Sequence, residues 1–407
     1  MTNREEKSKK IDEILDRGII REILPTREKF KEKLMNEKLK FYIGADPTNS
    51  SLHLSHAKNF MLLEEFRRLG HEVYILFGDF TATIGDPSDR TSARARLTRE
   101  DVMEFSKDWV KQIERLVDFK DESNPAKVVY NSEWLGKLSM VELINLMSNT
   151  TVQRMLERDM FQKRIVENKP IHLHEFIYPI FQGYDSVALD VDVELCGTDQ
   201  TFNALMGRTL VERYKKKEKF VVCVNLMENP VTGELMSKSR GTGVFLNVDA
   251  NTMFGQIMAQ PDEMIEILLI NDTRISKEKI KELDINNKPM EAKIFTAFEI
   301  VKIFFGKEQA LKVKDNFVNT FSKKNFPTDA PVFNLNFNEE ISLVDLIDKN
   351  FGDELSKSEI RRLIKQNSIT INDKKIDNIN YLISSKTGNE LQLKIGKRKF
   401  LLVKIRN

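Results

Sequence analysis

Short apolar runs alternate with longer stretches of helical periodicity over the first 247 residues. Five runs have the length of strands, and the residues between them repeat apolar side chains at helical spacing. One run, Val73–Phe77, is apolar throughout, as expected for a parallel strand buried on both faces. Strands that alternate with helices predict an α/β fold with a mostly parallel, doubly wound sheet. The expected strands are 41–45, 73–77, 128–130, 191–195 and 220–224.

The pattern is different before and after this region. The first residues form a charged stretch with an apolar stripe typical of a helix, broken at Leu24-Pro25. After residue 247 the pattern is helical, and a polar stretch with two prolines then has the composition of a linker. The tail begins with a helical pattern and ends in two short alternating strands. We expect a helical segment 1–38, a sheet domain 39–247, a helical domain 248–321, a linker 322–340 and a small α+β domain 341–407.

Composition narrows the class of protein. A chain of 407 residues with 41% apolar content can bury a large core. The first ten residues lack an apolar stretch and no apolar run has membrane-spanning length, so we expect neither a signal peptide nor a membrane partner. The two cysteines, Cys196 and Cys223, are too few for a disulfide framework and favour a cytoplasmic location.

Charge is distributed unevenly. Of the 64 Lys and Arg and the 62 Asp and Glu, 14 and 8 lie in residues 341–407, which leaves 50 and 54 in residues 1–340. A basic tail on a mildly acidic body suggests an appended module that binds a polyanion. Ordinary charge scatter is the alternative, and charge alone does not decide between them.

The junction between the first expected strand and its helix contains His53 and His56. Apolar residues at helical spacing follow the two histidines and stop at Gly70, which is a typical residue at the end of a helix. The histidines therefore lie at the N-terminus of this helix, and their spacing of three residues puts them on one face. Unpaired N–H groups and the helix dipole favour a phosphate there. Two solvent-facing histidines at a helix cap are the alternative. A metal site is not expected, because no Cys or carboxylate lies at ligand spacing.

Four polar segments follow expected strands. They are 44–56, 85–88, 197–200 and 236–241. Each alone is typical of a turn or solvated loop. Because ligands bind beyond the carboxyl ends of parallel strands, their joint placement predicts one site at that edge of the sheet.

A fifth segment, 174–185, has the pattern of an apolar helix with one polar stripe. Tyr178, Gln182 and Asp185 lie on that stripe. The stripe favours a ligand that is polar at several points, and core hydrogen bonds are the alternative. His172 and His174 alternate in sequence and are interpreted as structural.

These motifs resemble those of bacterial tyrosyl-tRNA synthetases, a family of class I aminoacyl-tRNA synthetases, over nearly the whole chain. His53–His56 resembles the class signature His-Ile-Gly-His, and Leu235–Ser239 resembles Lys-Met-Ser-Lys-Ser. The tail, with Leu355–Ile364 followed by 368–372, resembles a small RNA-binding fold. The resemblance is narrowed to the tyrosine enzymes by Tyr178, Gln182, Asp185 and 197–200.

The resemblance implies a Rossmann-like nucleotide-binding domain and a reaction in two steps. Tyrosine and ATP give tyrosyl-adenylate and pyrophosphate, and the tyrosyl group then passes to the 3'-terminal ribose of tRNA. Mg²⁺ would enter with ATP, and no tightly bound cofactor or protein metal site is implied. A homodimer is implied, with an insertion at 122–164 in the interface. The implied catalytic residues are Thr48, His53, His56, Lys238 and Ser239. The implied ATP-binding residues are Gly44, Asp46, His53, His56, Gly197, Asp199, Met236 and Lys238, with Asp46 and Asp199 on either the nucleoside or the α-amino network.

The resemblance also implies a tyrosine pocket. Tyr42 and Asp185 would bind the phenol, and a site built to hydrogen-bond that hydroxyl rejects phenylalanine by roughly 10⁴–10⁵. The implied contacts of the α-amino group are Asp86, Tyr178 and Gln182, and that of the carboxylate is Gln200. On the tail, the implied RNA-binding cations are Lys357, Arg361, Arg362 and Lys365.

Four positions depart from the family pattern. Ser55 replaces the signature glycine and Leu235 the first signature lysine, while Ala82 and Cys196 stand where glycine is common. Two functions other than tyrosine–tRNA ligase are alternatives. One is a catalytically weak or silent relative that binds RNA only, although the whole set of tyrosine-pocket residues is present. The other is a class I ligase for tryptophan, but Tyr42 beside Asp185 suits a phenol better than an indole.

Overall fold

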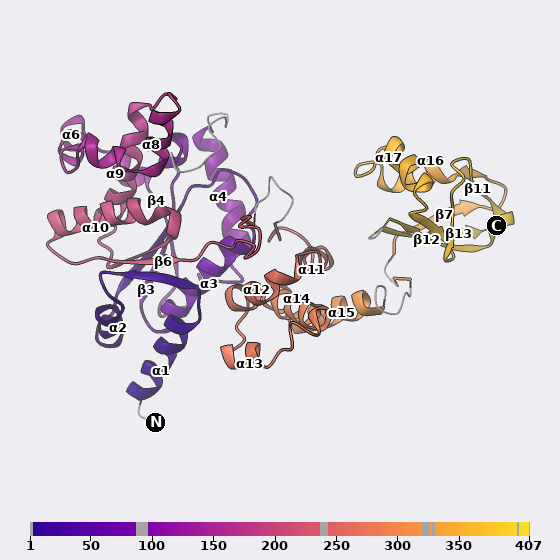
Figure 1. Ribbon diagram of the computed structural model, residues 1–407, viewed down its shortest axis with the longest axis horizontal. Coiled ribbons are helices and arrows are strands. Elements are labelled where there is room, and N and C mark those ends of the chain that lie inside the picture. The colour runs from indigo at the N-terminus through magenta and orange to yellow at the C-terminus, as the bar shows by residue number, and fades with distance from the viewer. Residues whose placement is uncertain are drawn as a thin grey trace. The chain divides into compact units, whose positions relative to one another are not determined.

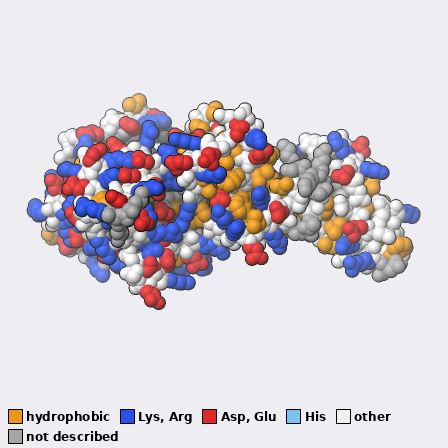
Figure 2. Space-filling model, turned by 90° about the horizontal axis from the view of Figure 1, so that it is seen from below, with side chains coloured by type: hydrophobic (Ala, Val, Ile, Leu, Met, Phe, Trp, Pro, Cys, Tyr) orange, Lys and Arg blue, Asp and Glu red, His pale blue; other side chains and the backbone are white. Residues whose placement is uncertain are grey.

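The computed structural model describes residues 3–86, 97–236, 243–319, 326–327, 330–396 and 399–406. The chain forms two compact units, Met1–Ala310 and Leu311–Asn407. Figure 1 shows the sheet of the first unit with helices on both of its faces. On the face drawn in Figure 2, Lys and Arg side chains are mixed with Asp and Glu side chains.

A six-stranded sheet forms the centre of the first unit. Its strand order is β1-β6-β5-β2-β3-β4, and every neighbouring pair except β1 and β6 is parallel. The predicted doubly wound α/β fold is therefore confirmed, although β5 begins two residues later than expected. The five parallel strands are β2 (Lys40–Ala45), β3 (Glu72–Phe77), β4 (Lys127–Tyr130), β5 (Val193–Gly197) and β6 (Phe220–Val224).

The N-terminal segment is not one broken helix, as its apolar stripe suggested. It consists of α1 (Asn3–Asp16), β1 (Ile20–Leu24) and α2 (Arg27–Asn36). Gly18 leaves the helix with φ of 103°, and β1 then pairs antiparallel with the edge of β6. The prediction was wrong because hydrogen bonds to a strand 200 residues away decide the conformation of β1, and local periodicity does not record them.

Helices on either face bury the sheet. α2 and α3 (Leu54–Arg68) pack on β2 through Phe30, Phe41 and Phe66, whose rings are fully buried; Phe41 and Phe66 stack with centroids 4.5 Å apart. α9 (Leu173–Ala188) and α10 (Thr201–Lys215) pack against each other. The remaining helices of this part are α4 (Arg99–Ile113), α5 (Ser132–Leu135), α6 (Met140–Met147), α7 (Val152–Leu156) and α8 (Asp159–Val166).

The region after the sheet is helical. Its elements are α11 (Ala250–Met258), α12 (Ile265–Asp272), α13 (Lys277–Lys281), α14 (Pro289–Phe305) and α15 (Lys307–Phe317). Arg17 ties the N-terminal segment to this region, because its guanidinium donates to the carbonyls of Ile270 and Ile275, each at 2.8 Å. Within the described ranges, no helix has the length and apolar character needed to cross a membrane.

The second unit has its own sheet and core. Its strands follow the order β10-β9-β12-β13-β7, and α16 (Leu343–Phe351) and α17 (Lys357–Lys365) contribute Ile347 and Ile360 to a fully buried cluster. The expected linker is wrong in its second half, because β7 pairs parallel with β13 and buries Leu335. The strands are β7 (Val332–Asn336), β9 (Ile369–Ile371), β10 (Lys374–Lys375), β12 (Glu390–Ile395) and β13 (Lys399–Arg406), with a separate pair of β8 (Ile341–Ser342) and β11 (Leu382–Ile383).

Candidate active site

A cavity of about 1280 Å³ lies beyond the carboxyl ends of the parallel strands. β2 and β5 are neighbours in the sheet, and the chain continues from β2 to β3 on one side and from β5 to β6 on the other. An open α/β sheet binds its ligands at such a point, where the strand order reverses. Three of the four polar segments predicted to meet at this edge, 44–56, 85–88 and 197–200, contribute residues to the lining of the cavity. The fourth, 236–241, lies outside the described residues beyond Met236. The lining includes Gly44, Asp46, Thr48, His56, Asp86, Tyr178, Gln182, Asp185, Gly197, Asp199 and Gln200.

Some expected site residues lie elsewhere. Tyr42 is fully buried behind the wall, and His53 and Met236 are not among the lining residues, although Leu235 is. Lys238 and Ser239 lie outside the described residues. His172 and His174 were interpreted as structural, yet both border the cavity, and their rings stack with centroids 5.7 Å apart.

The two signature histidines form a pair at the start of α3. The backbone N–H of His53 donates to Nδ1 of His56 at 3.3 Å, and the ring centroids are 4.1 Å apart. Burial lowers the pKa of His53 to about 4 and that of His56 to about 3. Both rings are therefore neutral at pH 7. Since Nδ1 of His56 accepts a hydrogen bond, its proton is on Nε2, and this N–H is available as a neutral donor in the cavity.

The loop before α3 is held in place by α4. Nε1 of Trp109 donates to the carbonyl of Asn49, and Nε2 of Gln112 donates to that of Ser50, each at 2.7 Å. Oε1 of Gln112 accepts from the backbone N–H of Leu52 at 2.9 Å. This loop contains Thr48, so α4 fixes the wall of the cavity at that point. Sequence analysis missed both tethers, because they join segments about sixty residues apart.

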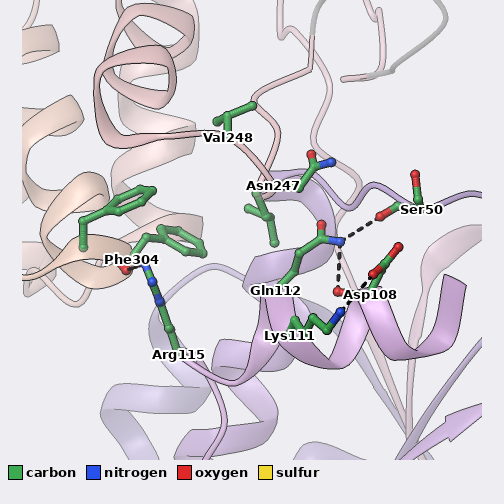
Figure 3. A pocket seen from close by; sticks show the side chains of 10 residues that line it. Ser50, Asp108, Lys111, Gln112, Arg115, Asn247, Val248 and Phe304 are labelled. Carbon is green, nitrogen blue, oxygen red and sulfur yellow. Dashed lines mark hydrogen bonds and ion pairs between the residues drawn. The ribbon is translucent and has the colours of Figure 1, made fainter. Parts of the chain in front are cut away.

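A smaller cavity of about 380 Å³ has Ser50 and Gln112 in its lining (Figure 3). Arg115, which lies just after the end of α4, donates to the carbonyl of Phe304, and its guanidinium lies 5.1 Å from the ring centroid of Phe305. Lys111 pairs with Asp108 at 3.5 Å. Both cations thus bind groups of the protein itself, and Arg115 connects the end of α4 to α14.

Asp46 lies at the end of β2 and accepts two hydrogen bonds. The hydroxyl of Tyr178 donates to it at 2.9 Å and that of Thr81 at 2.7 Å. Burial raises the pKa of Asp46 from 3.8 to about 7, although both hydrogen bonds favour the ionised form. Gly78 makes room for this carboxylate, because a Cβ there would lie 1.9 Å from Oδ1. Asp46 is thus bound to the polar stripe of α9.

Asp185 lies deeper, at 3% exposure. Its carboxylate accepts from Nε1 of Trp134 at 2.7 Å and from Nδ2 of Asn131 at 3.3 Å. Burial raises its pKa well above the ordinary value. The hydroxyl of Tyr42 lies 2.8 Å from Oγ of Ser186. The sequence analysis did not predict the contacts of Asn131, Trp134 and Ser186. These residues belong to no motif, and nothing in the sequence around them indicates a buried hydrogen bond.

A chain of side-chain amides crosses the floor of the cavity between α9 and α10. Nδ2 of Asn203 donates to Oε1 of Gln182 and to Oε1 of Gln200, each at 2.9 Å. Nε2 of Gln200 donates to Asp86 at 2.8 Å. At the other end, Nε2 of Gln182 donates to Glu194 of β5 at 3.2 Å. Three of the residues implied to bind tyrosine are therefore joined in one network.

No group of three or more His, Cys, Asp or Glu residues in the described parts of the chain is arranged to hold a metal ion. The cavity offers instead neutral imidazole, carboxylates and amides. Such a set can bind a zwitterion and a polar ring substituent, and can donate to phosphate oxygens.

Comparison with known proteins identifies the family of the chain. The family model of tRNA synthetases class I (W and Y) matches residues 33–322. A tyrosine–tRNA ligase of Carboxydothermus hydrogenoformans is 39% identical, covering 96% of this chain and 97% of the relative. That of Aquifex aeolicus is 40% identical, with the same two coverages.

Solved structures agree in fold. A C-terminally truncated mitochondrial tyrosyl-tRNA synthetase of Aspergillus nidulans has a TM-score of 0.65 at 20% identity, covering 78% of this chain and 99% of its own. The Archaeoglobus fulgidus tyrosyl-tRNA synthetase complexed with L-tyrosine has a TM-score of 0.58 at 20% identity, covering 76% and 99%. The family model and the fold are those of a class I tRNA synthetase. Within that class, the chain belongs to the tyrosine–tRNA ligase family.

Proposed function

We propose that this protein is a tyrosine–tRNA ligase that activates tyrosine with ATP and transfers it to tRNA. The observation that supports this most directly is the polar stripe of α9, Tyr178, Gln182 and Asp185, which borders the same cavity as the neutral donor of His56. An amino acid with a polar ring substituent can bind along such a stripe while its carboxylate lies near the histidine.

The ring end of the pocket suits a phenol. Asp185 accepts from Trp134 and Asn131, and its carboxylate has further lone pairs for a substrate hydroxyl. A carboxylate that is already oriented by two donors binds this hydroxyl without further ordering. We assign the α-ammonium group of tyrosine to Tyr178, Gln182 and Asp86, and its carboxylate to the side near Gln200.

In the first step the tyrosine carboxylate attacks the α-phosphate of ATP, the new bond is a mixed anhydride, and pyrophosphate leaves. The protein forms no covalent bond, so it acts by positioning and by stabilising charge. His56 donates from neutral Nε2 to a phosphate oxygen as charge builds there. We assign Thr48, Gly44, Gly197 and Asp199 to the nucleotide, with Lys238 and Ser239 adding charge and a donor. Mg²⁺ would arrive bound to the phosphates of ATP and would need few protein ligands.

In the second step the tyrosyl group passes to the terminal ribose of tRNA. The four cations Lys357, Arg361, Arg362 and Lys365 are all exposed on α17, which supports a contact with RNA phosphates. The activity belongs where tRNA and ATP are present, and we therefore place the protein in the cytoplasm.

We also propose that the protein is a homodimer. Large apolar side chains are exposed from α6 to the first residue of α9, an unusually high number for surface helices that face only water. Leu173 is 81% exposed and Val166 is 85% exposed. The other members of this group are Met140, Val141, Ile144, Met147, Val152 and Ile165. A second copy that presents the same patch would bury it.

The proposed activity is tested by pyrophosphate exchange into ATP with each amino acid in turn. Exchange that depends on tyrosine alone is expected. Exchange with tryptophan instead would change the substrate, and absence of exchange together with retained tRNA binding would favour the RNA-binding relative.

A further inference from the structure

A buried ion pair lies beneath the amide chain of the pocket. Lys219, which directly precedes β6, has no exposed surface, and Glu194 of β5 is 2% exposed. The ammonium of Lys219 donates to the carboxylate of Glu194. Burying two charges is costly unless further hydrogen bonds satisfy them, so the surroundings of this pair should be specific.

The surroundings are built for an ammonium group. Nζ of Lys219 also donates to Oγ of Ser186 at 2.8 Å and to the carbonyl of Ala204 at 3.2 Å, which gives three acceptors for its three protons. Gly207 of α10 leaves the necessary space, because a Cβ there would lie 2.5 Å from Nζ. The pair is therefore a fitted feature of the interface between α9, α10 and the sheet.

The pair contacts both ends of the pocket. Through Ser186 it reaches the hydroxyl of Tyr42, which lies 2.8 Å from Oγ. Through Glu194 it reaches Gln182, whose Nε2 donates to Oε1 of the carboxylate at 3.2 Å. Neither Lys219 nor Glu194 belongs to a motif of the sequence, and no role in the reaction has been given to either.

The charge of Glu194 decides which way the amide of Gln182 points. An ionised carboxylate only accepts hydrogen bonds, so Gln182 must turn its NH₂ group toward Glu194. Its oxygen then faces Asn203, which donates to it at 2.9 Å. Asn203 donates equally to the oxygen of Gln200, which leaves the NH₂ group of Gln200 for Asp86. Each amide along the chain has one orientation.

We propose that the Lys219–Glu194 ion pair positions the amino-acid site by fixing the orientation of the Gln182 amide. Its oxygen accepts from Asn203 with one lone pair and has a second lone pair for the α-ammonium group of tyrosine. This inference rests on the proposed function and deepens it. Lys219 holds the carboxylate of Glu194 in place, Glu194 orients Gln182, and the ammonium group of the substrate meets an oxygen acceptor. Both residues are positioning residues and need not touch the substrate.

The first test is Glu194→Gln in the full chain. The new amide can donate as well as accept, so Gln182 can adopt either orientation and presents its NH₂ group to a cation part of the time. The KM for tyrosine in pyrophosphate exchange should rise about tenfold, as for one lost hydrogen bond to a charged group. The KM for ATP should stay unchanged.

Glu64→Gln is the matched control. Glu64 of α3 is 1% exposed and accepts from Arg67 at 2.7 and 2.9 Å, so it is also a buried carboxylate in an ion pair of the same unit. It does not border the large cavity. This variant should lose stability and keep the KM for tyrosine.

Two further variants separate orientation from folding. Lys219→Met combined with Glu194→Gln removes both charges, which proteins often tolerate better than one unpaired buried charge. Its thermal stability should exceed that of Lys219→Met alone, while the KM for tyrosine stays raised. Gly207→Ala keeps every charge but displaces the ammonium group, and it should also raise the KM for tyrosine selectively.

The proposal is overturned if Glu194→Gln changes the KM values for tyrosine and ATP equally, or if the double variant regains the wild-type KM together with stability. An unchanged KM for tyrosine in Glu194→Gln would overturn it as well. Failure of the proposed function is a different result, since the unaltered protein would then show no tyrosine-dependent exchange.

Discussion

The hydroxyl of Tyr178 donates a hydrogen bond to the carboxylate of Asp46 across 2.9 Å, and this bond joins α9 to the end of β2. The carboxylate is buried beneath it, and its pKa is raised to about 7. A hydroxyl that favours the ionised form therefore opposes a desolvation that favours the neutral form. The balance between them determines how the catalytic unit responds to pH.

Asp46→Asn should change the pH dependence of stability. Between pH 3.8 and about 7 the folded protein holds the Asp46 proton and the unfolded chain does not. The contribution of Asp46 to the free energy of unfolding therefore falls as pH rises through this window, by up to about 1.4 kcal/mol per pH unit, and levels off above it. Urea unfolding at pH 5 and pH 7 should show a smaller decrease in the variant. Parallel pH profiles would contradict this assignment.

Tyr178→Phe gives the complementary change. It removes a hydrogen bond that lowers the pKa of Asp46, so that pKa should rise further. The decrease in stability with pH should then continue above pH 7, where the unaltered protein has levelled off. Urea unfolding between pH 7 and pH 8.5 measures the difference, and a plateau at the same pH in both proteins would argue against the hydrogen bond.

His56→Ala should lower kcat for tyrosine-dependent exchange by about 10²–10³-fold, as for the loss of one oriented donor at a developing charge. His56→Gln keeps an N–H donor and should lose less. His71→Ala is the control, because His71 is buried, also has a lowered pKa and lies away from the cavity. It should reduce stability and leave kcat unchanged; equal losses in both alanine variants would make the effect of His56 structural.

Asp185→Asn should weaken tyrosine binding by about 1–3 kcal/mol, because the buried phenol hydroxyl loses its carboxylate acceptor. Discrimination against phenylalanine, measured as the ratio of kcat/KM values in exchange, should fall with it. Asp79→Asn is the matched control, since Asp79 is 1% exposed, accepts from the N–H of Ser132 and does not line the cavity. If both variants bind tyrosine equally well, the phenol is bound elsewhere.

Leu173→Asp places a charge in the proposed apolar patch, at the first residue of α9. Sedimentation should show a dimer for the unaltered protein and a shift toward monomer in the variant, because the charge would have to be buried without a partner. Met290→Asp, at a side chain that is 59% exposed on α14, should leave the dimer intact. If the unaltered protein is a monomer, the proposal that a second copy covers this patch is wrong.

The sequence predicts those elements of the fold whose conformation is determined by residues close together in the chain. The strand 73–77, the helix of Tyr178 and the loops after β2 and β5 follow from periodicity and turn residues, and each formed as expected. β1 and β7 were missed because each becomes a strand only by pairing with a distant edge.

The same reason explains the site. Tyr178, Gln182 and Asp185 were predicted because helical spacing aligns them. Glu194 and Lys219 were not, because their pairing depends on how two strands and two helices meet, and a lysine or glutamate in a sequence normally predicts a solvated surface. Buried polar networks of this kind are found only in the folded structure.

The pairing of β1 with β6 has a consequence for synthesis on the ribosome. Ile20 is hydrogen-bonded in register with Val224, so the N-terminal strand cannot find its partner until the chain has been translated past residue 224. Until then β1 has no partner strand, and an unpaired apolar strand is prone to associate with the wrong partner. The central strands can assemble earlier, whereas the outer edge of the sheet is completed last by the residues that emerged first.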